Sequence, residues 1–245
     1  MTDIIVFRLD APLAAFGDLT VGERRTTHSR PAFSAILGFV AGALGVPRDA
    51  PGHEALAAGL AMAVRCDGLG APLADFHTAQ TPPQRRGRGY DTRKAELAVK
   101  SELGTIVSRR DYWTDAAFTV LLWPNAEAPY KAAEIAAALN RPVYAGFVGR
   151  RACPLGRPPA AKVIEAATVS DGLAAYDSAQ AAAEAGLRPP PIDGDIAFDS
   201  ALAEVLGDLQ ETRRDMRRDL ILSRARWQFA PRAESVARRR EGVLA

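Results

Sequence analysis

Cysteine, histidine and lysine are all scarce in this chain of 245 residues. With only Cys66 and Cys153, the chain cannot build a disulfide framework or a four-ligand structural zinc site. The three histidines, His28, His53 and His77, are scattered and form no His-x-x-x-His pattern, which argues against a catalytic metal. We therefore expect neither a metal nor a cofactor.

Several other missing patterns each exclude a class of function. The longest uncharged run, 31–47, has 17 residues and three glycines, which is short for a membrane span. No Gly-x-x-x-x-Gly-Lys-Ser/Thr or Gly-x-Ser-x-Gly motif occurs, and Gly-Arg-Gly at 87–89 lacks the next glycine of a dinucleotide loop. Nucleotide hydrolysis and serine-hydrolase activity thus have no support. The N-terminal segment 1–10 is typical of a strand rather than a signal peptide, so we expect a cytoplasmic protein with no membrane partner.

Arginine, by contrast, is abundant: there are 27 arginines and four lysines, in a chain whose formal net charge is only +2. Residues 164–212 carry ten acidic residues and one basic residue, whereas residues 213–245 carry ten arginines and four acidic residues. A GC-rich genome favours arginine codons, which explains the shortage of lysine but not this segregation. Opposed charge blocks indicate a charged surface with a partner. Balanced charge and 48% hydrophobic residues also exclude disorder as the dominant state.

Hydrophobic periodicity predicts an α+β fold. Residues 4–9 are typical of a buried strand, and apolar residues at three- and four-residue spacing predict a helix that begins at Pro31 and ends at Gly45. The other expected elements of this part are strands at 61–67, 72–78, 116–123 and near 143–148, and a helix at 129–139. In this order the elements match the β-α-β-β-α-β pattern of a ferredoxin-like (RNA-recognition-motif-like) domain with an extended β-hairpin.

We expect two regions in the chain. Residues 1–157 would form the ferredoxin-like domain, and residues 158–245 would form a smaller C-terminal region that contains β-structure. Within the second region, residues 172–187 are typical of an alanine-rich helix, 189–191 of a turn or linker, and 220–223 of a short strand.

A basic excursion rich in glycine and proline, at about 80–111, separates two of the expected strands. Arginine forks suit phosphates, glycines allow the backbone to approach RNA, and a tyrosine can stack on a base. The alternative is a solvated loop whose charges keep an exposed hairpin from aggregating, and composition leaves both open. The candidate RNA-binding residues of the excursion are Arg85, Arg86, Arg88, Tyr90, Arg93, Lys94, Arg109 and Arg110.

A second candidate site is the glycine- and arginine-rich turn 146–156. Successive backbone N–H groups in such a turn form an anion-binding concavity, and Arg150 and Arg151 would reinforce it. The alternative is a plain surface turn.

The histidines and the tail leave further alternatives open. Metal-free ribonucleases use histidine as an acid or base, so His28 and His77 are candidates, but a structural or surface role is the favoured interpretation for each. The arginine-rich tail can clamp RNA, dock a subunit or remain a solvated face, and the sequence does not separate these.

Seven segments occur in an order that is informative as a set. They are Leu9–Gly17, Arg25 with 31–45, Val64–Asp67, Asp75–Thr78, Arg110–Tyr112, Asp115–Val120 and Gly149–Leu155. Together they resemble the CasD family, the subunit that binds the 5′ handle of the CRISPR RNA in the subtype I-E Cascade complex, within the RAMP superfamily of repeat-associated RNA-binding proteins.

The resemblance implies a ferredoxin-like domain whose basic excursion is the thumb hairpin of the family. It implies a non-catalytic subunit that caps the backbone filament, holds the hooked 5′ handle and presses its thumb on the first repeat-to-spacer position. The implied partners are the CRISPR RNA, the adjacent backbone subunit and the large subunit, with target DNA met only through the complex. Carried over by position, the handle contacts would be Arg25, Gly149, Arg150 and Arg151, with Arg24 as a further candidate beside Arg25.

Two alternatives remain. A metal-independent endoribonuclease that processes CRISPR repeat RNA would use histidine with tyrosine and lysine, as related subunits do in another subtype. A solitary RNA-binding protein is disfavoured by the opposed charge blocks and by the small-residue helix face of Gly38 and Gly42, which indicate assembly.

Overall fold

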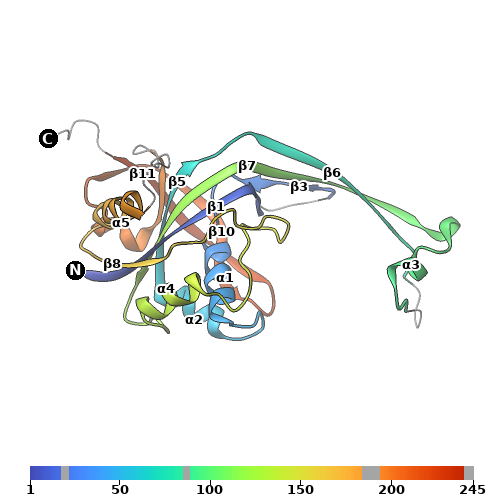
Figure 1. The fold of residues 1–245 in the computed structure, drawn as a ribbon, viewed down its shortest axis with the longest axis horizontal. Helices are drawn as coiled ribbons and strands as arrows, with labels where there is room; N and C mark the ends of the chain where they lie inside the picture. Colours follow the sequence, from blue (N-terminus) through green and yellow to red (C-terminus); the bar gives the residue numbers. More distant parts are fainter. Residues whose placement is uncertain (18–21, 85–88, 184–193, 240–245) are drawn as a thin grey trace.

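The computed structural model describes residues 1–17, 22–84, 89–183 and 194–239, and these form an α+β fold around one large sheet (Figure 1). The strands are β1 (Thr2–Ala14), β2 (Phe16–Gly17), β3 (Arg24–Arg25), β4 (Thr27–His28), β5 (Leu60–Gly68), β6 (Pro72–Thr81), β7 (Gly104–Pro124), β8 (Lys162–Ala166), β9 (Ile196–Asp199), β10 (Leu209–Ser223) and β11 (Gln228–Arg239). The large sheet has the order β10-β11-β9-β5-β7-β1-β8, and β3 and β6 also pair with β7. The predicted α+β class is confirmed.

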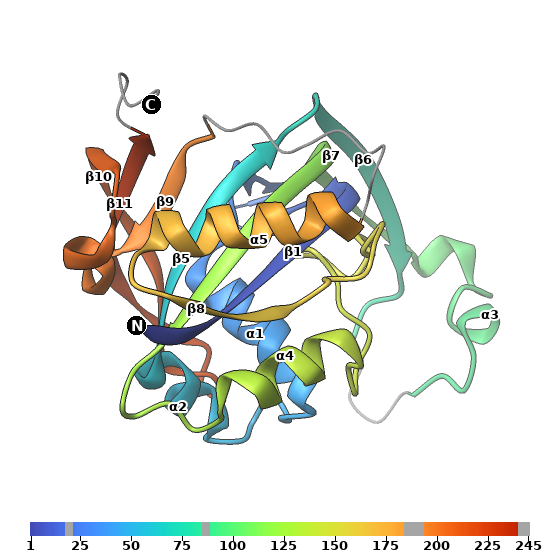
Figure 2. The same cartoon turned by 60° about the vertical axis from the view of Figure 1, so that its left-hand side comes forward.

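Helices cover both faces of this sheet (Figure 2). α1 (Phe33–Leu44), α2 (Gly52–Gly59) and α4 (Ala132–Asn140) lie on one face, and α5 (Val169–Ala183) lies on the other. The short helix α3 (Arg93–Glu96) lies away from the body of the sheet, and the 3-10 turns are η1 (Lys100–Glu102) and η2 (Ser200–Val205). Side chains alternate along β1, so that Phe7 and Leu9 pack with α1 and α4 while Ile4 and Val6 pack with α5. The predicted buried first strand is therefore confirmed. Across the described residues, no helix has both the length and the apolar character that a membrane crossing requires.

Helix α1 begins slightly later than predicted. The expected first residue, Pro31, precedes the helix, because Ala32 is the N-cap residue and its carbonyl accepts the N–H of Ile36. A carboxylate oxygen of Asp219, on β10, accepts the N–H of Phe33 at 2.8 Å and so caps the helix from another strand. The predicted end at Gly45 is confirmed by its left-handed φ of 79°.

The strand predicted near 143–148 is wrong. The backbone N–H groups of Val143 and Tyr144 donate to Ala43 and Gly42 of α1, at 3.0 and 3.3 Å, so this segment follows the helix instead of the sheet. The fourth strand of the predicted pattern is β8, which pairs antiparallel with the first residues of β1.

The strands predicted at 61–67 and 72–78 are β5 and β6, and both pair with β7 instead of with each other. Their partner β7 has 21 residues, of which the predicted strand 116–123 is only the inner end. We call β6, the first ten residues of β7 and the turn between them the projecting hairpin (residues 72–113). It extends far from the body of the molecule (Figure 1) and begins at 72 instead of about 80.

The described residues after 157 contribute four strands to the same sheet, because β8 pairs with β1 and β9 pairs with both β5 and β11. The arginine-rich tail forms a long β10–β11 hairpin where only a short strand at 220–223 was predicted. The predicted helix 172–187 is α5, which begins at Val169, and the predicted turn 189–191 lies outside the described residues. The division of the chain near residue 157 stays a prediction.

Several arginines of the tail are buried in an ion network instead of facing a partner. The Arg232 guanidinium donates from Nε and Nη2 to the Asp219 carboxylate at 2.9 and 3.0 Å, and from Nη2 to Glu234 at 3.0 Å. Arg30, from the N-terminal loop, donates to Glu234 at 2.6 Å and to Asp215 at 2.7 Å. These bonds fasten the tail hairpin to the loop that precedes α1.

Candidate nucleic-acid interface

Three strands lie side by side where the projecting hairpin leaves the body of the sheet. Strand β3 pairs with β7 so that Arg24 lies opposite Arg109 and Arg25 lies opposite Arg110. On the other side of β7, Phe76 of β6 lies opposite Arg109. Because directly opposed residues share a face, Arg24, Arg109 and Phe76 form one row across the three strands.

This row is open to solvent, since the Phe76 residue is 71% exposed and Arg24 and Arg109 are exposed as well. Arginine contacts phosphates through its planar fork, and aromatic rings stack on bases. Arg25 and Arg110, the next opposed pair, form a second row, which alternation turns to the other face of the two strands. We call these two rows, together with Arg151 of the turn that carries Arg150, the base surface.

Acidic side chains neutralise only part of the base surface. Asp111 accepts the Arg24 Nε–H at 2.9 Å, and its other oxygen lies 3.9 Å from the Arg109 Nε. The Arg24 side chain is 61% exposed, so this ion pair is weak and gives way readily to a phosphate.

Arg150 joins β3 to β7. Its guanidinium donates from Nη1 to the Asp111 carbonyl at 2.9 Å and from Nη2 to the Arg25 carbonyl at 2.7 Å. It also lies over the ring of Tyr112, 4.8 Å from the centroid. Arg150 is therefore a positioning residue for the arginines of β3.

Gly149 allows the turn that carries Arg150 to approach the end of β1. Its φ is 87°, and a Cβ at this position would lie 1.9 Å from the carbonyl oxygen of Ala15. The turn is closed by the Val148 N–H, which donates to the Cys153 carbonyl at 2.8 Å. Only glycine fits here, because any side chain would overlap the backbone of β1.

The described candidates that remain, Tyr90, Arg93 and Lys94, lie in α3 or shortly before it, at the far end of the projecting hairpin (Figure 1). There the Arg93 guanidinium donates to the Gln80 carbonyl at 2.5 Å and pairs with Glu96 at 2.5 Å, whereas Lys94 is exposed. Arg85, Arg86 and Arg88 lie outside the described residues. The structure thus brings together Arg24, Arg25, Arg109, Arg110 and Arg150, with Gly149 and Arg151 beside Arg150 in the chain, and separates them from Tyr90, Arg93 and Lys94.

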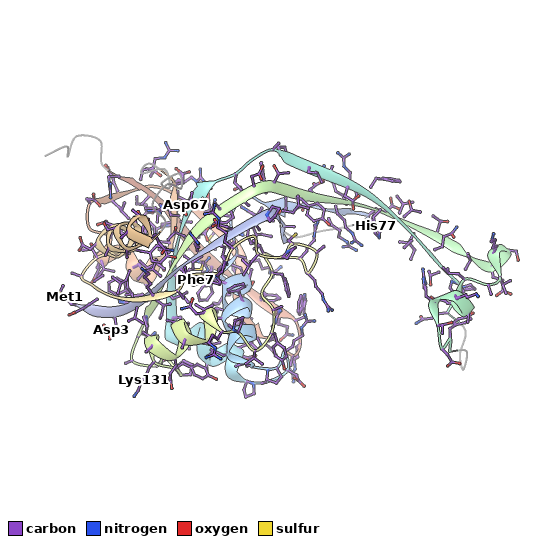
Figure 3. All side chains as sticks on the ribbon, viewed as in Figure 1. Met1, Asp3, Phe7, Asp67, His77 and Lys131 are labelled. Atoms are coloured by element: carbon purple, nitrogen blue, oxygen red, sulfur yellow. The ribbon has the colours of Figure 1, made fainter. Side chains whose placement is uncertain are left out.

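The two histidines considered for acid–base chemistry lie on different elements. His28 pairs with Phe16 in the small sheet of β2 and β4. His77 stands exposed on β6 of the projecting hairpin (Figure 3), with its Nδ1 3.8 Å from Asp75. Searching the described residues finds no group of three or more His, Cys, Asp or Glu side chains arranged to hold a metal.

Sequence reasoning missed Phe76 as a site residue. Its strand was predicted, but the register that places it opposite Arg109 depends on β7, whose outer half was not predicted. Alternation alone does not reveal which face of a strand meets which neighbour.

Comparison with known proteins identifies the family. The sequence model described as CRISPR-associated protein (Cas_Cas5) matches residues 4–233. The chain is a member of the Cas5 family. This Cas5-family chain is 30% identical over 205 residues to the CRISPR system Cascade subunit CasD of Escherichia coli (strain K12), over 80% of this chain and 81% of that protein. The resemblance to the CasD family is thereby confirmed.

Two solved structures share the fold of the Cas5-family chain. A chain of a CRISPR RNA-guided surveillance complex has a TM-score of 0.64 at 24% identity, covering 96% of this chain and 90% of that chain. A structure described as a Cas protein has a TM-score of 0.61 at 22% identity, covering 96% and 95%. At these identities the likeness shows the fold alone.

Proposed function

We propose that this Cas5-family chain is the Cascade subunit that holds the 5′ handle of the CRISPR RNA, without cleaving it. The base surface is the observation that carries this proposal. Its arginines on β3 and β7 lie on adjacent strands, beside the exposed Phe76 ring of β6. Arg151 follows Arg150, whose guanidinium bonds the main chain of β3. Handle binding needs phosphate contacts and stacking platforms for splayed bases, and the base surface offers both.

The topology supports a ferredoxin-like domain. The strands β8, β1, β7 and β5 are neighbours in the order fourth, first, third and second along the chain, with α1 and α4 packed on one face. This order arises when a β-α-β-β-α-β chain folds into one antiparallel sheet. The projecting hairpin is then an extension between the second and third strands, in the position of the thumb of the family.

The proposed partners follow from this arrangement. The projecting hairpin reaches the first repeat-to-spacer position of the guide RNA and the adjacent backbone subunit, while the body meets the large subunit. Target DNA is met through the assembled complex. No acid–base pair is required for these tasks, and His28 and His77 lie on separate elements.

The test compares RNA that carries the repeat-derived handle with a scrambled RNA of equal length, using the full chain and the assembled complex. Arg24→Ala with Arg25→Ala removes two exposed guanidiniums and is expected to weaken binding of the handle RNA by about 10- to 100-fold. Arg141→Ala, which removes an exposed arginine outside the base surface, is the matched control and leaves binding unchanged.

Two results would contradict the proposal. Equal affinity for handle and scrambled RNA would remove the handle assignment. Specific cleavage of repeat RNA by the lone chain in EDTA, lost in His28→Ala or His77→Ala, would show the endoribonuclease alternative instead.

A further inference from the structure

A groove of about 480 Å³ opens beside α1. Its walls include Gly38, Gly42 and Phe39 of the helix, and Tyr144 and Phe147 of the segment that follows α4. A Cβ on either glycine would meet nothing within 4 Å. The small-residue face of α1, which the sequence analysis linked to assembly, therefore leaves room for a further group above both glycines among the described residues.

Two arginines at this groove carry charge that the described residues leave unbalanced. The guanidiniums of Arg48 and Arg224 lie 5.2 and 4.2 Å from the ring centroid of Trp227, and neither forms an ion pair in the described part of the chain. The Arg224 Nε is buried without a hydrogen-bond partner. Burial lowers the pKa of the Arg224 guanidinium from its ordinary value, and the Arg48 charge lowers it further. Two like charges beside one ring are stabilised by an anion.

The nearest carboxylate does not fill this role. Glu54 accepts the backbone N–H of Arg224 at 2.9 Å, so it fixes the main chain of the turn instead of neutralising the guanidinium. His53 also lines the groove and is only 4% exposed. Its Nε2 bonds the Pro47 carbonyl at 3.1 Å, which leaves the buried Nδ1 without a partner.

Aromatic rings stand at the same place. Tyr144 and Phe147 are 56% and 42% exposed, although large apolar side chains are normally covered. Exposed rings next to unpaired arginines and a flat helix face are the elements on which a nucleobase stacks while its phosphate is held. The volume also lies in the range of sites for small ligands.

We propose that this groove binds one nucleotide of single-stranded RNA, with its phosphate at Arg48 and Arg224 and its base over the Gly38–Gly42 face. The inference rests on the proposed function and deepens it. Gly149 lines the groove as well, so the turn that carries Arg150 lies between the groove and the base surface. The RNA would run from the base surface across this turn into the groove.

The sharpest test is Gly42→Leu, which fills the groove without breaking a contact. Leucine is a better helix former than glycine, so thermal stability is expected to stay equal or rise. Affinity of the full chain for single-stranded handle RNA is expected to fall about tenfold, because one stacked base is displaced. A purely structural role of this face predicts lower thermal stability and unchanged RNA affinity.

A second variant removes the charge. Arg48→Ala with Arg224→Ala is expected to weaken the same RNA about 10- to 100-fold. The matched control, Arg141→Ala with Arg218→Ala, removes two exposed arginines elsewhere and leaves affinity unchanged. A series of handle RNAs carries a photoreactive uridine at one position each. The RNA whose modified position occupies the groove is expected to crosslink to the peptide that contains Tyr144 and Phe147.

Three outcomes would overturn the inference. Unchanged RNA affinity in Gly42→Leu and in the double arginine variant removes it. Unchanged RNA affinity with loss of another subunit from the assembled complex shows that the groove docks a polypeptide. If the groove variants leave RNA affinity unchanged while Arg24→Ala with Arg25→Ala lowers it, only this inference fails and the proposed function stands.

Discussion

Replacing Arg150 separates direct RNA contact from positioning. Its guanidinium makes two short hydrogen bonds, to the Asp111 and Arg25 carbonyls, and a longer one of 3.4 Å to the Thr26 carbonyl, and it covers the Tyr112 ring. Hydrogen bonds from a charged donor contribute about 1.5 kcal/mol each, and the cation–π contact about 0.5–1 kcal/mol. Arg150→Ala thus removes about 3–4 kcal/mol of local attachment between β3 and β7.

Besides its two-residue pairing with β7, the other contacts of β3 are weak. The Arg109 N–H donates to the Glu23 carbonyl at 3.1 Å, and the ion pair of Arg24 with Asp111 is a surface pair with about 0–1 kcal/mol of stabilisation. We therefore expect Arg150→Ala to release β3, and with it the phosphate contacts of Arg24 and Arg25.

The assay is the salt dependence of binding to single-stranded RNA. Each phosphate contact adds about 0.7 to the slope of log affinity against log salt. Arg151→Ala removes one contact and lowers the slope by about 0.7, whereas Arg150→Ala lowers it by about 1.4, the effect of two arginines. The Arg109 amide donates to the Glu23 carbonyl, so its hydrogen exchange in the RNA-free chain reports whether β3 stays attached. This exchange is expected to accelerate in Arg150→Ala and to stay unchanged in Arg151→Ala.

Arg150→Lys adds a further discrimination. Lysine retains the charge but lacks the planar fork, so it is expected to leave the Arg109 amide as unprotected as alanine does. Equal slopes for Arg150→Ala and Arg151→Ala, with an unchanged Arg109 amide, would refute the positioning role.

Two further predictions concern stability. Asp219→Ala leaves the buried Arg232 guanidinium without its main partner and is expected to cost about 3–5 kcal/mol in urea unfolding, against about 0–1 kcal/mol for the more exposed Asp215→Ala; equal losses would contradict it. Burial lowers the pKa of His53 below its ordinary value of 6.5, so the unfolded chain binds a proton there that the folded chain does not. Stability is therefore expected to fall as pH drops below about 6.5, and His53→Gln to remove that part of the dependence; an identical pH profile for the variant would disprove it. The charged side chains around this imidazole are Arg48, Glu54 and Arg224.

Periodicity located the elements whose apolar faces are buried in the core. The buried strand β1 and the apolar stripe of α1 could be predicted because burial imposes their periods of 2 and 3.6. The strand predicted near 143–148 was wrong because an apolar sequence does not always mean a buried segment. Its apolar residues Val143 and Tyr144 are 64% and 56% exposed, and Tyr144 lines a groove instead of packing in the core.

The candidate site could be predicted only by residue type. The arginines of β3 and β7 were identified, but their juxtaposition depends on a pairing between segments far apart in the chain. The role of Arg150 depends on a bond to a carbonyl 125 positions away, which leaves no local signal. The tail illustrates the same limit, because Arg217 and Arg232 are opposed on β10 and β11 and are buried with carboxylates instead of facing solvent.

Because β7 runs without interruption from the core into the projecting hairpin, a small rotation in the core becomes a large displacement at the tip. The ten paired residues of the hairpin extend roughly 33 Å beyond the sheet at about 3.3 Å per residue. The same strand is clamped inside the body between β1 and β5, so the angle of the hairpin is fixed by the twist of the core. A change in twist of roughly 5° would move the tip by about 3 Å, close to the rise of one residue along a strand. Substitutions deep in the core of this chain can therefore shift the register at which the tip meets its target, without altering any residue at the tip itself.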